Sequence, residues 1–296
     1  MANLRDIRRR IKSVKNTAQI TKAMQLVAAS KMKKAQDQAT AGRSYADLLN
    51  KVLNNLKEQT SAEDHPLLRE KSEGGDLVIL ITTDKGLCGP LNTNLLRLVT
   101  EKVSKDATFI TIGSKGRQAM ARLKRNILAD FTVKDPVSFA ETKPVSEFVM
   151  ERFLAGDYGR VQVAFTNFVN TIRQEPHIET LLPISPIELG KKKGFEGMGG
   201  DASHAAEGPG YSGYLFEPTT REVLDTVVPQ YVGYQLYQMV LESRASEHSA
   251  RMVAMKAATD NAKQMIKDLT LEYNKQRQAS ITAELLEITT AMRALE

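Results

Sequence analysis

The sequence predicts an α/β protein in which the N- and C-terminal helices form a long antiparallel coiled coil beside a Rossmann-like α/β domain. Three observations lead to this prediction. No proline precedes Pro66, and neither glycine nor proline follows Gly233, so both ends of the chain can form long helices. Both ends carry apolar or small residues spaced alternately three and four apart, the spacing of coiled coils. The middle alternates strand-like and helix-like runs, which is typical of a largely parallel sheet covered by helices.

The two repeats can be followed residue by residue. The amino-terminal repeat contains Leu4, Ile7, Ile11, Val14, Ala18, Thr21, Gln25, Ala28, Met32, Ala35 and Ala39. The carboxy-terminal repeat contains Leu241, Ala245, His248, Met252, Met255, Thr259, Ala262, Ile266, Leu269 and Tyr273. Many of these residues are small or soft, which predicts a thin, closely approached seam. Pairing within one chain brings the two ends together. The alternative is that each helix packs separately on the globular domain, but neither stripe looks wide enough for a core helix.

The middle of the chain predicts five strands and three helices. The strands are expected at 77–82, 107–113, 126–133, 160–170 and 177–184, and the helices at 92–103, 114–125 and 145–154, the last beginning after Pro144. A glycine-rich stretch at 190–213 predicts a loop. We therefore expect residues 1–60 to be the N-terminal coiled-coil helix, 61–208 the α/β domain with this loop at its end, and 209–296 the C-terminal coiled-coil helix.

The charge is concentrated at the start of the chain. The 296 residues carry a net charge of +6, whereas residues 1–59 hold 13 lysines and arginines against 4 acidic residues, a balance of +9. Such a helix suits either an acidic protein partner or nucleic acid, but it lacks the interleaved aromatic residues of a nucleic-acid-binding module. No apolar run approaches the ~20 residues of a membrane span, and no signal peptide is expected. The single cysteine, Cys88, excludes an internal disulfide.

The sequence predicts no catalytic, metal or cofactor site. Two turns, TTDKGLCGPLN and GSKGRQ, follow predicted strands and carry Lys85 and Lys115. Neither matches a phosphate-binding motif, so tight turns are favoured over the alternative of a nucleotide-binding enzyme. Cys88 lies near Lys85, which leaves open some thiolate character. The four histidines, at 65, 177, 204 and 248, lack metal-ligand spacing, and we interpret His248 as a packed polar residue on the seam.

The C-terminal tip is apolar beyond any point that the α/β domain is expected to cover. Its apolar residues are Leu285, Leu286, Ile288 and Met292. An apolar helix end beyond its own fold is typical of insertion into a partner's cavity.

Four stretches, spread over nearly the whole chain, resemble one family. They are IRRRIKSVKNTAQITKAMQLVAASKM, TTDKGLCGPLN, SEHSARMVAMKAATDNAKQMI and YNKQRQASITAELLEI, and they resemble the γ subunit of the F-type ATP synthase. The resemblance implies a rotor shaft that passes through a ring of α and β subunits and contacts the ε subunit and the membrane c-ring, but not nucleic acid. It implies a non-catalytic subunit, peripheral on the cytoplasmic face of the cell (inner) membrane. Rotation of the shaft would couple proton flow to ATP synthesis or hydrolysis on β, although sodium as the coupling ion stays open.

The resemblance also assigns roles to individual residues. Contacts with β are implied for Met24, Arg251, Arg277, Gln278 and Thr282, contacts with the c-ring for Tyr214 and Glu217, and a bearing contact for the apolar tip. Met24 could instead be a seam residue, and Arg277 an exposed charge. The stretch 190–213 lies where the chloroplast subunit carries a regulatory insertion with paired cysteines. It contains no cysteine here, which excludes thiol control of that kind.

Overall fold

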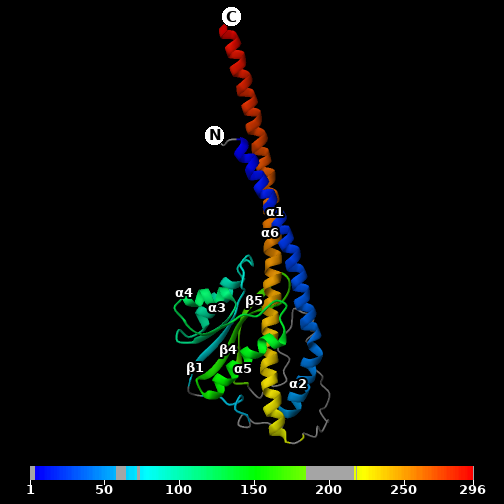
Figure 1. Cartoon of the computed structure of the whole chain (residues 1–296), viewed down its shortest axis with the longest axis vertical. Coiled ribbons are helices and arrows are strands. Elements are labelled where there is room, and N and C mark those ends of the chain that lie inside the picture. The colour runs from blue at the N-terminus through cyan, green and yellow to red at the C-terminus, as the bar shows by residue number, and fades with distance from the viewer. Residues whose placement is uncertain (1–3, 58–64, 72–73, 185–216, 218, 296) are drawn as a thin grey trace. The chain divides into compact units, whose positions relative to one another are not determined.

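The computed structural model describes residues 4–57, 65–71, 74–184, 217 and 219–295 (Figure 1). The chain divides into two compact units. The first combines the residues up to Ala28 with those from Met252 onward, and the second is Ala29–Arg251. No helix in these described ranges is long and apolar enough to cross a membrane. The predicted division at residues 60 and 208 stays a prediction, and the stretch 190–213 lies outside the described residues.

The first unit is an antiparallel pair of helices. It combines the first part of α1 (Leu4–Ala41) with the second part of α6 (Thr220–Leu295). The hydroxyl oxygens of Thr21 and Thr259 lie 2.7 Å apart. Nη2 of Arg8 donates to the hydroxyl of Tyr273 at 2.6 Å. The contact nearer the start of α1 is nearer the end of α6, so the helices run in opposite directions.

The predicted seam is confirmed in this unit. Ile7, Thr21 and Ala28 of α1 are buried, as are Met255, Thr259 and Ala262 of α6. Most of the residues between the predicted seam positions are exposed. The other predicted seam residues in these two segments are half-buried: Leu4, Ile11, Val14, Ala18, Gln25, Met252, Ile266, Leu269 and Tyr273. The repeat of three and four therefore places one narrow stripe of each helix against the other.

The end of α6 extends past the start of α1 (Figure 1). The Thr21–Thr259 contact sets a register in which Leu4, the first described residue of α1, lies beside residue 276. From Arg277 to Leu295, α6 thus has no described α1 residue beside it. Its four apolar tip residues are 58–64% exposed: Leu285, Leu286, Ile288 and Met292.

The second unit contains a five-stranded sheet. The strands are β1 (Gly75–Ile81), β2 (Thr108–Ile112), β3 (Asn126–Phe131), β4 (Tyr158–Phe168) and β5 (Gln174–Leu182). Their order is β3-β2-β1-β4-β5. The pairs β1–β2, β1–β4 and β2–β3 are parallel, and β4–β5 is antiparallel. The prediction of a largely parallel sheet is confirmed, and the order reverses between β1 and β4.

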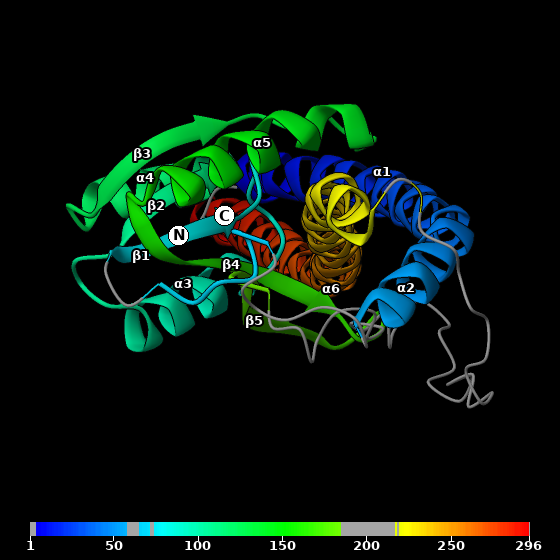
Figure 2. The same cartoon turned by 90° about the horizontal axis from the view of Figure 1, so that it is seen from below.

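Helices cover both faces of this sheet (Figure 2). Leu77 and Ile79 of β1 pack in one core with α5 (Phe139–Ala155), the start of α6 and residues of α1 and α2 (Arg43–Lys57). Val78 and Leu80 pack in a second core with α3 (Leu91–Lys102) and α4 (Ser114–Arg122). Successive β1 residues therefore belong to opposite layers, because strand side chains alternate between faces.

The first half of α6 corrects one expectation. The helix begins at Thr220, within the stretch 209–296 expected to form it, and continues through Pro229 and Gly233. The run 231–249 is buried almost throughout, so the expectation that its stripe is too narrow for a core helix is wrong. A Cβ at Gly233 would lie 3.3 Å from Oγ of Ser146. The glycine therefore allows close packing against α5.

Two helix boundaries differ from the prediction. The amino-terminal helix is interrupted at Gly42, whose carbonyl accepts a hydrogen bond of 2.9 Å from the hydroxyl of Tyr234. A Cβ at Gly42 would lie 3.0 Å from that hydroxyl. Helix α5 begins at Phe139 rather than after Pro144. Proline removes one backbone donor from the helix, and burial of Val145, Val149 and Phe153 compensates for its loss.

Candidate functional site

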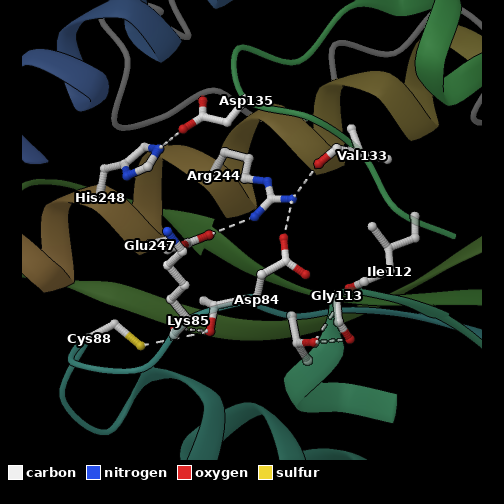
Figure 3. Close-up of polar contacts among 12 residues, drawn as sticks. Asp84, Lys85, Cys88, Ile112, Gly113, Val133, Asp135, Arg244, Glu247 and His248 are labelled. Atoms are coloured by element: carbon white, nitrogen blue, oxygen red, sulfur yellow. Dashed lines mark hydrogen bonds and ion pairs between the residues drawn. The ribbon is translucent and has the colours of Figure 1, made fainter. Parts of the chain in front are cut away.

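A buried polar cluster lies where the carboxyl ends of the parallel strands meet α6 (Figure 3). Arg244 of α6 is at its centre, with a side chain only 7% exposed. Its Nη1 donates to Oε2 of Glu247 at 2.8 Å. Its Nη2 donates to the carbonyl oxygen of Val133 at 2.9 Å and to Oδ2 of Asp84 at 3.3 Å. One guanidinium thus joins α6 to the segments that follow β1 and β3.

The surroundings keep Arg244 charged. Burial lowers the pKa of Arg244, but the negative charges of Glu247 and Asp84 and their hydrogen bonds outweigh it, so that the pKa lies above its ordinary value. Buried charges of this kind are tolerated when they are paired and hydrogen-bonded. The cluster therefore remains an ion network at physiological pH.

Arg251 continues the network about two helical turns beyond Arg244 on α6. Its Nη2 donates to Oε1 of Glu247 at 2.8 Å and to the carbonyl oxygens of Lys85 and Gly86, each at 3.3 Å. Its side chain is 12% exposed. The guanidinium predicted to contact a β subunit is thus held against the turn after β1.

His248 connects the cluster to α1. Its Nε2 lies 3.1 Å from Oδ2 of Asp135, but the two groups are not oriented for a hydrogen bond. Nζ of Lys31 donates to the same oxygen at 2.8 Å. Burial lowers the pKa of His248 and outweighs the nearby carboxylates, Glu247 and Asp135, which raise it. Burial raises the pKa of Asp135, but the Lys31 hydrogen bond and the charge of His248 bring it below its ordinary value. His248 is buried, as predicted.

The turn after β2 is not an open anion site. The first three amides of α4 already have protein acceptors. The amide of Ser114 donates to Oδ1 of Asp84 at 3.0 Å, that of Lys115 to the carbonyl of Thr83 at 3.1 Å, and that of Gly116 to Oγ1 of Thr82 at 2.8 Å. A phosphate at a helix N-terminus requires these amides to be free. The tight-turn interpretation of GSKGRQ is confirmed.

The turn after β1 is held on one side by Asn92 of α3 and exposes Leu87 to solvent. Asn92 Nδ2 donates to Oγ1 of Thr83 at 2.7 Å and lies 3.5 Å from Sγ of Cys88, which is buried. Leu87, next to this cysteine, is 61% exposed and has a φ of +63°. A positive φ is strained for a branched residue and tends to occur at functional positions. The turn 84–89 thus presents one strained apolar side chain.

The structure does not bring the predicted β-contact residues into one surface. Met24 is half-buried on α1, and the register places it beside residue 256 of α6. Arg277 is 21 residues further along α6, roughly 30 Å away at the rise of an α-helix. Arg277, Gln278 and Thr282 are exposed, with Oγ1 of Thr282 donating to the carbonyl of Gln278 at 2.9 Å.

The two predicted c-ring residues are less informative. Glu217 is exposed, and Tyr214 lies outside the described residues.

Comparison with known proteins decides the family. The model of the ATP synthase family matches residues 3–295. The ATP synthase gamma chain of Akkermansia muciniphila is 52% identical over 299 residues and covers 100% of both chains. The chain belongs to the ATP synthase gamma chain family. The gamma chain of Opitutus terrae is 49% identical over 296 residues, with 99% of each chain covered.

Solved structures agree with this family and with the fold. A chain of the Euglena gracilis mitochondrial ATP synthase, from a structure of OSCP, F1 and the c-ring, matches with a TM-score of 0.67 at 25% identity. The match covers 99% of this gamma chain and 94% of that chain. A chain from the central stalk and c-ring structure of the Tetrahymena thermophila mitochondrial ATP synthase has a TM-score of 0.59 at 25% identity, covering 81% and 99%.

Sequence reasoning missed the polar cluster of this gamma chain. Arg244, Glu247, His248 and Arg251 are spaced by three, one and three residues, which places them on one face of a helix. A charged face on a helix usually indicates contact with solvent. The available signal was that apolar residues flank this face on the same helix, as in YVGYQLYQMVL, so that the charged face had to be buried with the rest.

The buried carboxyl group of Glu242 should make the stability of the chain depend on pH. Burial, with the nearby charge of Glu179, raises the pKa of Glu242 well above 4.5. A raised carboxyl pKa contributes stability below the unfolded pKa, and this contribution is lost as the pH rises through the folded pKa. We expect Glu242→Gln to gain stability relative to the wild type as the pH rises from about 4.5 to about 8, in urea unfolding of the full chain. Exposed Glu147→Gln is the control, and parallel pH profiles for Glu242→Gln and the wild type would contradict the prediction.

Proposed function

We propose that this gamma chain is the central rotor shaft of an F-type ATP synthase, and that its rotation couples proton flow through the membrane ring to ATP synthesis or hydrolysis on the β subunits. The observation that carries the proposal is the C-terminal part of α6, which leaves the coil as a single helix with an exposed apolar tip. An exposed apolar segment of this kind requires a partner surface. Membership in the gamma chain family and the likeness to central-stalk chains support the same function.

Each part of the chain has its own proposed partner. The tip residues Leu285, Leu286, Ile288 and Met292 fit an apolar sleeve formed by the α and β subunits. The basic start of α1 suits acidic loops of β. Tyr214 and Glu217 contact the c-ring, and the α/β domain contacts ε. The chain is peripheral on the cytoplasmic face of the cell (inner) membrane. It carries no catalytic residues, which are supplied by β.

The mechanism follows from asymmetry. One shaft inside a ring of three β subunits presents a different surface to each of them. A partner shifts a conformational equilibrium only by binding the two states differently, and the orientation of the shaft supplies this difference. Each turn of the shaft therefore takes every β subunit through the same series of states.

The proposed contacts with β lie at different positions along the helices α1 and α6. Arg277, Gln278 and Thr282 are exposed and free to meet β directly. Met24 is half-buried beside residue 256 of α6, so part of its side chain is available to contact β there. Arg251 is engaged with the turn 84–89, and its proposed contribution to coupling passes through that turn.

The experiment that tests the proposal is Met24→Lys in the assembled complex. A lysine at this half-buried position adds a charge against β. We expect ATP-driven proton pumping to fall roughly tenfold at matched rates of ATP hydrolysis, since altered contacts change coupling by up to about 2 kcal/mol. The measurement is acidification of membrane vesicles beside ATP hydrolysis by the same vesicles.

The matched control is Asn16→Lys, at an exposed position on the same helix. It adds the same charge outside the seam and is expected to leave pumping unchanged. Equal pumping by Met24→Lys and the wild type would remove Met24 from the coupling surface. Failure of the chain to associate with any α/β ring would overturn the proposed function itself.

A further inference from the structure

We propose that Glu247 is a positioning residue that links Arg244 and Arg251 into one charged chain and so fixes the turn 84–89, with its exposed Leu87, to the shaft helix. The proposal deepens the proposed function and rests on it. It gives the buried cluster a role in coupling in addition to its role in the fold.

The geometry of Glu247 supports this role. Each of its carboxylate oxygens accepts from a different arginine, Oε2 from Arg244 and Oε1 from Arg251, both at 2.8 Å. Its side chain is 7% exposed. The three residues are spaced by three and four along α6, so they form a continuous row on one face. Hydrogen bonds between charged groups are about twice as strong as neutral ones.

The row holds the turn at two points. Arg244 binds the Asp84 side chain at the first residue of the turn, and Arg251 binds the carbonyls of Lys85 and Gly86. Asp84 is in turn fixed by the amide and hydroxyl of Ser114. A force applied at Leu87 is therefore transmitted to α6 through charged hydrogen bonds rather than through loose packing.

The chemistry requires a glutamate. Two guanidinium groups need two acceptors, and a carboxylate supplies both. Glutamine keeps the shape but has one acceptor oxygen, and its NH2 group would face one of the arginines as a second donor. Glu247→Gln thus breaks one half of the link while preserving side-chain volume.

The test is Glu247→Gln in the assembled complex, with two measurements. The first is hydrogen exchange of the Ser114 amide, which donates to Asp84 of the turn and which we expect to exchange roughly 10- to 100-fold faster because one charged hydrogen bond is lost. The second is proton pumping at matched ATP hydrolysis, expected to fall roughly twofold or more. The control is Glu147→Gln, an exposed glutamate paired with Lys143, which should change neither.

The outcomes separate the inference from the proposed function. Faster exchange with unchanged pumping would overturn the positioning role and leave the rotor function intact. Unchanged exchange would show that the row does not hold the turn and would overturn the inference. If Glu247→Gln does not assemble, Arg251→Met breaks the other half of the link and is read by the same two measurements, with the same results expected.

Discussion

Arg244→Met is expected to lower the free energy of unfolding of the chain by about 3–5 kcal/mol. Methionine fills much of the same space but provides no donor. Oδ2 of Asp84, Oε2 of Glu247 and the carbonyl of Val133 each lose a hydrogen bond. The Glu247 side chain is 7% exposed, so water cannot replace the lost donor without opening the core. The cost arises mainly from Oε2 of Glu247, which is left buried without a donor although Oε1 still accepts from Arg251, rather than from the net strength of the ion pair.

Urea unfolding of the full chain measures this effect. Arg117→Met is the matched control, because Arg117 pairs with Asp130 at 3.2 Å but is 53% exposed. Exposed pairs contribute about 0–1 kcal/mol, so the control should be nearly neutral. The double variant Arg244→Met and Glu247→Met removes this buried carboxylate, but it also removes the side-chain acceptor of Arg251, so it should recover only part of the loss. Equal effects of Arg244→Met and Arg117→Met would contradict the account of the cluster.

Gly113→Ala is expected to destabilise the chain by about 3 kcal/mol, a large fraction of the roughly 5–15 kcal/mol by which native proteins are stable. Gly113 has a φ of +104°, and a Cβ there would lie 2.2 Å from the carbonyl oxygen of Thr82. This contact is with backbone, which cannot rotate away. The shift would also disturb the amides of Ser114 and Gly116, which are bonded to Asp84 and Thr82.

Gly75→Ala provides the comparison in the same sheet. A Cβ at Gly75 meets nothing within 4 Å, so this variant should differ from the wild type by less than about 1 kcal/mol. Thermal unfolding of the purified full chains, together with the soluble yield, distinguishes the two variants. A folded Gly113→Ala protein as stable as Gly75→Ala would show that the approach of β1 and β2 at this point can relax.

The sequence predicted the coil well because its physical signal is periodic. Thr21 and Thr259 were placed on seams by spacing alone, and the structure brings their hydroxyls to 2.7 Å. The strand order needed more than periodicity, but the alternation of strands and helices was sufficient for a largely parallel sheet. Pro229 and Gly233 are helix-breaking residues that nevertheless lie inside α6, because packing against the rest of the fold overrides local helix propensity.

The buried cluster could not be predicted for a different reason. A charged face on a helix indicates solvent unless the opposing elements supply counter-charges. Here these come from Asp84 and Asp135, which follow β1 and β3 and are remote from Arg244 in the sequence. The exposed Leu87 gave no periodic signal either, because its importance rests on one backbone dihedral angle.

A chain that turns as a rotor inside a ring of β subunits can be observed directly as it rotates. The ring would be fixed to a surface through β, and a probe would be attached to the chain at Leu123, which is exposed on the α/β domain. With ATP present, the account predicts stepwise rotation of the probe in one direction, at a rate that follows ATP hydrolysis. Hydrolysis of ATP by the assembled ring while the probe stays at a fixed or randomly fluctuating angle would contradict it.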